Sequence, residues 1–105
     1  MSKIDEDFGK RVKFYRIYKG FSQEKLAELS ELHPTHLGRI ERGQKICTLK
    51  TAERIAKALK VPIEDLLENT DHFPQKEFEE FLNLSAQDKR TIFKIMRKNV
   101  KIKHE

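Results

Sequence analysis

The residues best suited to chemistry lie close together in one short stretch, SELHPTHLGRIERG, which spans residues 30–43. His33 and His36 stand three positions apart and could chelate zinc, whereas Arg39 and Arg42 could bind an anion. A zinc site needs further ligands, and the chain has a single cysteine and no carboxylate pair at matching spacing. We therefore expect no metal and no cofactor. We interpret His33 as a helix cap and His36 as a surface residue.

The single cysteine, Cys47, cannot form a disulfide within the chain and fits a reducing compartment. We interpret it as a semi-buried loop residue rather than a redox sensor. Catalysis would require a nucleophile beside a base, or paired carboxylates in a cleft, and the sequence suggests neither. The chain is not expected to be an enzyme.

Composition predicts one small domain with an appendage. The chain has 105 residues, of which 37% are hydrophobic and 37% charged, so helices with wide polar faces are expected. No apolar run approaches the roughly 20 residues that span a bilayer, and the N-terminus has no signal-peptide core, so we expect a cytoplasmic chain with no membrane partner. The net charge is +3 over residues 1–70, −3 over 71–84 and +5 over 85–105. This excess of positive charge favours an anionic partner such as nucleic acid.

Apolar periodicity and capping residues predict an all-α chain without strands. Helices are expected over about 6–19, from Ser22, over 34–42, from Thr48 and from Pro62. A further helix is expected around 75–82, and a capping box at 85–88 opens a last one. The predicted inward-facing residues are Phe8, Val12, Tyr15, Leu26, Ala27, Leu29, Leu37, Ile40, Leu49, Ala52, Ile55, Ala56, Leu59, Ile63, Leu66 and Leu67.

Three segments follow from this pattern: a domain over 4–68, a turn-rich linker over 69–74, and a C-terminal helical segment over 75–105 with a basic tail. The first helix also carries a second apolar stripe, Phe14, Ile17 and Tyr18. Either this stripe is ordinary core with scattered surface aromatics, or it docks the C-terminal segment through an apolar residue of that segment. The candidate docking residues are Phe78, Phe81 and Leu82.

Three motifs, SQEKLA, IERG and AKAL followed by V and LL, occur in order between residues 22 and 67. With the stretch from Phe8 to Glu68 that contains them, they resemble the Xre/Cro family of DNA-binding domains. The resemblance implies a five-helix, lambda-repressor-like helix-turn-helix fold. One position departs from the family, because Glu31 stands where glycine is usual. A non-glycine residue in the left-handed conformation costs roughly 1 kcal/mol.

The resemblance also implies site residues. The helix over 34–42 would enter the major groove, with its contact residues near its N-terminus. Arg39 is the strongest candidate for base readout, since bidentate pairing with guanine contributes about 1–3 kcal/mol of discrimination. The implied base-contact set is Pro34, Thr35, His36, Gly38 and Arg39. The implied phosphate-contact set is Gln23, Arg42, Lys45 and Lys13. Arg16 and Glu41 match a pair that locks the first helix to the third in relatives.

We expect a sequence-specific transcriptional regulator of double-stranded DNA, in the first instance a repressor, that acts as a homodimer on an inverted repeat. Activation, as by the controller proteins of restriction–modification systems, uses the same fold. Two alternatives stay open: an antitoxin that binds a toxin and represses its own operon, and a protein-interaction adaptor that barely binds DNA. The dimer interface could lie on the last helix or on the fourth and fifth helices. Residues 75–101 could also bind a protein partner or flanking phosphates.

Overall fold

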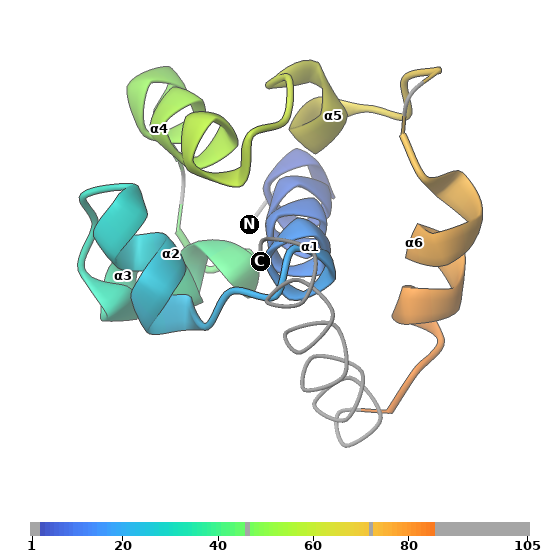
Figure 1. The fold of residues 1–105 in the computed structure, drawn as a ribbon, viewed down its shortest axis with the longest axis horizontal. Helices are drawn as coiled ribbons and strands as arrows, with labels where there is room; N and C mark the ends of the chain where they lie inside the picture. Colours follow the sequence, from blue (N-terminus) through green and yellow to red (C-terminus); the bar gives the residue numbers. More distant parts are fainter. Residues whose placement is uncertain (1–2, 46, 72, 86–105) are drawn as a thin grey trace, which may run out of the picture.

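The computed structural model describes residues 3–45, 47–71 and 73–85, and all their regular structure is helical (Figure 1). The helices are α1 (Lys3–Tyr18), α2 (Gln23–Leu29), α3 (Pro34–Glu41), α4 (Leu49–Leu59), α5 (Glu64–Leu67) and α6 (Gln75–Leu82). The predicted all-α fold, with five helices followed by a sixth, is confirmed over this range. The predicted last helix, from about 85 to 101, falls outside the described residues. No described helix is long and apolar enough to cross a membrane.

The helix boundaries follow local chemistry. α1 ends two residues before Gly20, which has a φ of 81° that suits glycine. The Ser22 hydroxyl caps α2 by accepting a hydrogen bond from the Lys25 N–H at 3.0 Å, and Thr48 caps α4 in the same way. α1 begins three residues earlier than predicted, with Asp5 and Glu6 in its first turn, where they complement the helix dipole.

α1 lies at the centre of the molecule, with α2 and α3 on one side and α6 on the other, while α4 and α5 close the top in Figure 1. The core forms where α1 meets the other helices. Its fully buried side chains are Val12, Leu26, Leu37, Ile40, Ile55, Leu59 and Leu66. All seven were among the predicted inward-facing residues.

Three predicted inward positions are wrong, because Leu29, Leu49 and Leu67 are 44%, 68% and 53% exposed. A helix turns about 100° per residue, so Ser30, not Leu29, follows Leu26 on the inner face of α2. Ser30 is only 1% exposed. The other two leucines stand at the first residue of α4 and the last of α5, where no neighbouring helix covers them.

The second stripe of α1 docks α6, as one of the two interpretations predicted. The ring of Phe14 lies 5.3 Å from that of Phe78 and 5.5 Å from that of Phe81, both in edge-to-face geometry. Leu82 does not take part in this docking, since it is 40% exposed. The segment predicted as a linker has no helix, but its Phe73 is buried against Phe14. α6 is therefore packed onto the domain.

Arg11 on α1 contacts the segment over residues 69–74 that was predicted as a linker. Its guanidinium carbon lies 4.5 Å from the centre of the Phe73 ring, and its Nη2 donates to Asn69 Oδ1. Nearby, the Tyr15 hydroxyl donates to Asp65 Oδ2 at 3.2 Å. Burial, followed by the charge of Asp65 and this hydrogen bond, raises the pKa of Tyr15 well above its ordinary value. These contacts fix α6 to the body that carries α2 and α3.

Candidate nucleic-acid interface

α2, the turn after it and α3 form a helix-turn-helix unit with capped ends. The turn residue Glu31 has a φ of 59°, the left-handed conformation expected where the family has glycine. The His33 ring caps α3, because its Nδ1 accepts a hydrogen bond from the Thr35 N–H at 3.1 Å. Pro34 then occupies the first helical position, which needs no N–H donor. The first turn of α3 is thus held rigidly at the surface.

The two faces of α3 differ in burial. Leu37, Ile40 and Glu41 face inward and are buried. Three of the predicted base-contact residues, Pro34, Thr35 and Arg39, are exposed, and His36 is partly exposed. Positions 34, 35, 38 and 39 fall within about 140° of the helix circumference, because each residue turns the helix by about 100°. Of these four, Pro34, Thr35 and Arg39 are exposed, whereas the predicted base-contact residue Gly38 is buried.

A hollow of about 280 Å³ borders this side of α3 and is lined by Gln23, Pro34, Thr35, Gly38 and Arg42. The structure therefore brings together predicted base and phosphate residues from both helices. A side-chain carbon at Gly38 would sit 3.2 Å from Arg42 Nη1 and 3.7 Å from Gln23 Nε2. The missing side chain leaves room for the Arg42 and Gln23 side chains beside the α3 backbone.

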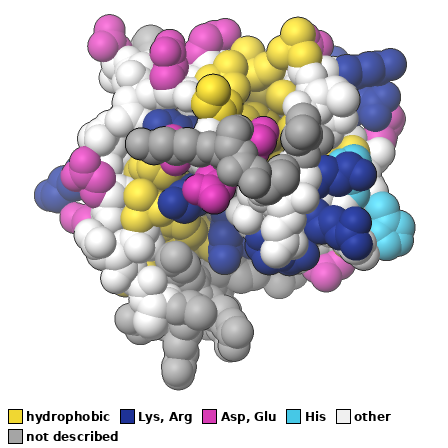
Figure 2. All heavy atoms as spheres, turned by 180° about the vertical axis from the view of Figure 1, so that it is seen from behind, with side chains coloured by type: hydrophobic (Ala, Val, Ile, Leu, Met, Phe, Trp, Pro, Cys, Tyr) yellow, Lys and Arg dark blue, Asp and Glu magenta, His cyan; other side chains and the backbone are white. Residues whose placement is uncertain are grey.

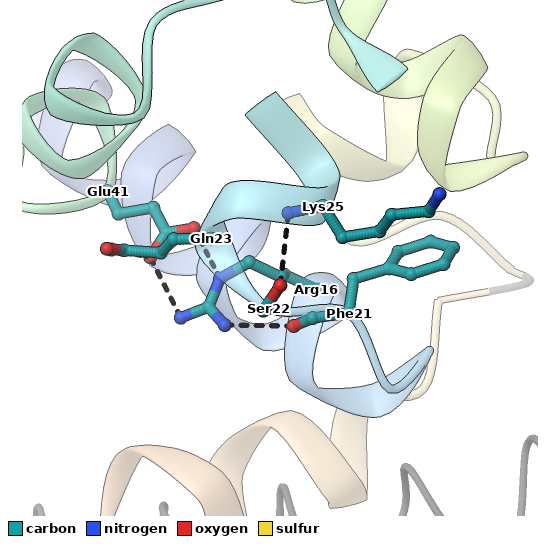
Figure 3. A network of polar contacts seen from close by, with 6 residues as sticks. All are labelled: Arg16, Phe21, Ser22, Gln23, Lys25 and Glu41. Atoms are coloured by element: carbon teal, nitrogen blue, oxygen red, sulfur yellow. Dashed lines mark hydrogen bonds and ion pairs between the residues drawn. The ribbon is translucent and has the colours of Figure 1, made fainter. Parts of the chain in front are cut away.

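The predicted ion pair between α1 and α3 is present (Figure 3). Arg16 Nε lies 2.7 Å from Glu41 Oε2, and Arg16 Nη2 lies 3.1 Å from Glu41 Oε1. Arg16 Nη1 also donates to the Phe21 carbonyl oxygen at 3.0 Å. The two charged side chains are only 8% and 2% exposed, so each depends on the other for its charge compensation. The network sets the position of α3 relative to α1.

Gln23, predicted to contact phosphate, is engaged in the same network. Its Nε2 donates to Glu41 Oε1 at 3.1 Å, which uses one of its two side-chain N–H donors and fixes the side chain against Glu41. The side chain also borders the hollow around Gly38. Gln23 is the first residue of α2, where the helix dipole favours an anion.

Cations surround α3. Figure 2 shows dark blue and cyan side chains gathered at the edge that corresponds to the side of α2 and α3 in Figure 1. Arg39, Arg42 and Lys45 are exposed, and Arg42 is oriented by a hydrogen bond from its Nε to Gln44 Oε1 at 3.0 Å. Lys13 is partly buried on α1, one turn before Arg16. This surface is suited to the phosphate backbone.

The two histidines have separate roles. The His33 Nδ1 is used as the cap of α3. Burial lowers the pKa of His36, and the positive charges of Lys45 and Arg39 lower it further. No group of three metal-binding side chains occurs among the described residues.

Cys47 is a half-buried loop residue, as predicted. Its thiol contacts the Thr48 carbonyl oxygen at 3.5 Å. Burial, with a smaller effect from the charge of Asp5, raises the pKa of the thiol to about 11. Since the thiolate is the reactive form, this environment opposes redox chemistry.

Sequence reasoning missed Gly9, which lies on α1 where that helix meets the backbone at the end of α3. A side-chain carbon there would overlap the carbonyl oxygen of Ile40 and lie 2.9 Å from that of Glu41. The glycine therefore lets α1 approach the end of α3 directly. A glycine inside an otherwise amphipathic helix was the available signal.

Comparisons with known proteins agree with this geometry. A family model described as helix-turn-helix matches residues 12–66. Control protein C.SmaI of Serratia marcescens is 42% identical over 64 residues, covering 61% of this chain and 76% of that protein. Control protein C.BamHI of Bacillus amyloliquefaciens is 45% identical over 64 residues, covering 60% and 79%. The crystal structure of the restriction-modification controller protein C.AhdI from Aeromonas hydrophila superposes with a TM-score of 0.58 at 39% identity, covering 59% of this chain and 94% of that one.

The fold and the basic, exposed α3 define a DNA-binding transcriptional regulator. The chain belongs to the helix-turn-helix family of the Xre/Cro type, whose model matches more than half of it. The resemblance inferred from the sequence motifs is confirmed.

Proposed function

We propose that this chain is a control protein that binds an inverted-repeat operator as a homodimer and regulates genes of a restriction–modification system. The proposal is supported by the identity to control proteins and by one observation above all. Predicted base-contact and phosphate-contact residues from α2 and α3 line the same exposed hollow. Repression by blocking polymerase is the expected outcome, and activation would use the same surface.

α3 is proposed to lie in the major groove, with Arg39 reading a base edge and Thr35 beside it. Arg42 and Lys45 would contact phosphates on either side. Gln23 would contribute its backbone N–H at the start of α2, since its side chain is bound to Glu41.

An exposed apolar patch is proposed as the dimer interface. Ile4, Leu49 and Leu67 are 74%, 68% and 53% exposed, and with Ile63 they border a hollow of about 230 Å³ at the start of α1, on α4 and around α5. A hydrophobic area runs along the top of Figure 2, over α4 and α5. Large exposed apolar residues that adjoin one another mark association sites. Of the two interfaces that the sequence left open, we propose this one, and a protein partner for 75–101 stays a prediction.

The test of DNA readout compares variants on a selected duplex by fluorescence anisotropy. Arg39→Ala should lose about 1–3 kcal/mol on the preferred site and less on random DNA. Lys45→Ala should weaken binding to both equally and reduce the salt slope by about 0.9. Lys76→Ala, an exposed cation on α6, is the matched control and should change nothing. Equal effects of all three substitutions would contradict the proposed readout.

The dimer is tested by sedimentation. Leu49→Lys should convert the chain to monomers and lower operator affinity, whereas Leu82→Lys on α6 should leave the dimer intact. A Leu49→Lys chain that stays dimeric would place the interface elsewhere, although DNA readout by α3 could still hold.

A further inference from the structure

A second hollow lies away from the α3 face, between the C-terminal ends of α2 and α4. It has a volume of about 590 Å³ and is larger than the hollow around Gly38. Its lining consists of Phe21, Leu29, Ser30, Glu31, Arg54, Lys57, Ala58 and Lys60. The two hollows have no lining residue in common.

Three cations border this hollow. Arg54, Lys57 and Lys60 recur every three residues along the end of α4, and none of them forms an ion pair with a described residue. Glu31 is the one acidic side chain in the lining. The lining also includes the apolar side chains of Phe21, Leu29 and Ala58. The chemistry is that of a site for an anion carried on an apolar body.

A buried hydroxyl in the lining lacks a partner. Ser30 is 1% exposed, and its Oγ makes no hydrogen bond with any described residue. A buried polar atom without a partner costs about 1–3 kcal/mol. Among the described residues, such atoms occur on Ser30 and Arg11. Of these two residues, Ser30 is the one that lines the hollow.

Backbone strain is concentrated at the same place. Among the described residues, two that are not glycine have a positive φ, Glu31 at 59° and Lys60 at 58°, and both line this hollow. Glycine would relieve each of them by roughly 1 kcal/mol. Glu31 is the turn residue of the helix-turn-helix and Lys60 is the C-cap of α4, so the turns of the chain account for both conformations. Both residues carry a charged side chain and line the hollow.

We propose that this hollow binds a small organic anion, a carboxylate or phosphate monoester on an aromatic or aliphatic body. The anionic group is held by Arg54, Lys57 and Lys60, and the body packs on Phe21 and Leu29. The volume falls within the roughly 300–1,000 Å³ of small-molecule sites. Figure 3 shows the Phe21 ring pointing away from the Arg16 network, while its carbonyl faces Arg16. A ligand on this ring would contact Phe21, whose carbonyl oxygen accepts a hydrogen bond from Arg16, the partner of Glu41 on α3. The ligand is expected to bind in this hollow when DNA is absent.

The test is an NMR titration of the full-length, ¹⁵N-labelled chain without DNA. The ligands are 3-phenylpropionate and phenyl phosphate, with 2-phenylethanol and inorganic phosphate as the uncharged and non-apolar controls. We expect saturable amide shifts at Phe21, Leu29 and Ala58 with at least one of the two organic anions. Whichever anion binds more tightly identifies the anionic group, and neither control should produce the same shifts.

The matched variants are Arg54→Gln with Lys57→Gln, and Lys10→Gln with Lys76→Gln, which remove the same charge inside and outside the hollow. The first pair should weaken binding roughly tenfold or more, and the second pair should not. No saturable shift with either organic anion would overturn the proposal. Equal shifts with inorganic phosphate, or equal weakening by both pairs, would do the same. None of these outcomes bears on DNA readout by α3.

Discussion

Replacing Arg16 with methionine tests how the interface is held in place. The substitution keeps an unbranched apolar stem but removes the guanidinium. Glu41 would lose the contacts at 2.7 and 3.1 Å and keep its hydrogen bond from Gln23. Its carboxylate, on a side chain only 2% exposed, would then be buried without a compensating charge.

An uncompensated buried charge costs about 3–5 kcal/mol, a large part of the roughly 5–15 kcal/mol that stabilises a typical domain. Even the lower figure should reduce the melting temperature of a domain this size by roughly 12 °C or more. Urea unfolding followed by circular dichroism measures the loss. Because α3 is tied to α1 by this pair, DNA affinity should fall as well.

The double variant Arg16→Met with Glu41→Met separates the pair from its parts. It should recover at least half of the stability lost by Arg16→Met, because no buried charge remains. A loss of less than about 1 kcal/mol in the single variant would refute the reasoning, since that is the value of an exposed pair. A double variant as unstable as the sum of both single variants would refute it too.

Four further predictions concern α1, the turn and α3. Gly9→Ala should destabilise the fold by about 2 kcal/mol or more in urea unfolding, because the new carbon overlaps backbone oxygens of α3. Gly38→Ala should instead fold at least as stably, since its nearest neighbour is the flexible end of Arg42, yet bind DNA more weakly. Glu31→Gly should raise stability by roughly 1 kcal/mol by relieving a φ of 59°. For His36, the folded pKa lies below its ordinary value of 6.5, so the unfolded chain binds more protons. Stability should therefore fall as pH drops through and below about 6.5, and fall less in His36→Gln.

Each of these has a result that would contradict it. A Gly9→Ala chain of native stability would mean that α1 and α3 do not approach as closely as described. Unchanged DNA affinity in Gly38→Ala would show that the space beside Gly38 plays no part in DNA binding. If Glu31→Gly lowers stability, the contacts of the glutamate side chain stabilise the fold by more than its left-handed backbone conformation costs. Identical pH profiles for the native chain and His36→Gln would show that His36 titrates alike in both states.

Much of the helix-turn-helix was predictable from local rules. Ser22 and His33 precede their helices as caps, and the proline after His33 fits a first helical turn. The alignment of predicted contact residues on one face of α3 follows from helical spacing alone. The pairing of Arg16 with Glu41 could not come from spacing, because the residues are 25 positions apart, and it required the family resemblance.

Except for Leu29, whose exposure follows from the helical repeat, the errors and omissions depend on tertiary packing. Leu49 and Leu67 carry the inward pattern but stand at helix ends that no other helix covers, so their exposure depends on how α4 and α5 meet. Phe73 lies among turn formers, and its burial depends on the position of α6. The hollow bordered by Arg54 and Lys60 joins the ends of two helices distant in sequence, which periodicity cannot show.

The most direct test of the proposed function is a binding selection from random duplex DNA with the full-length chain, followed by a salt titration on the recovered site. We predict a palindromic site whose half-sites are about 34–36 Å apart, or a multiple of that spacing. The affinity should fall steeply with salt, with a log–log slope near −0.9 per phosphate contacted. Failure to enrich any site, with weak binding even at low salt, would contradict the account of α3 as a DNA-reading helix.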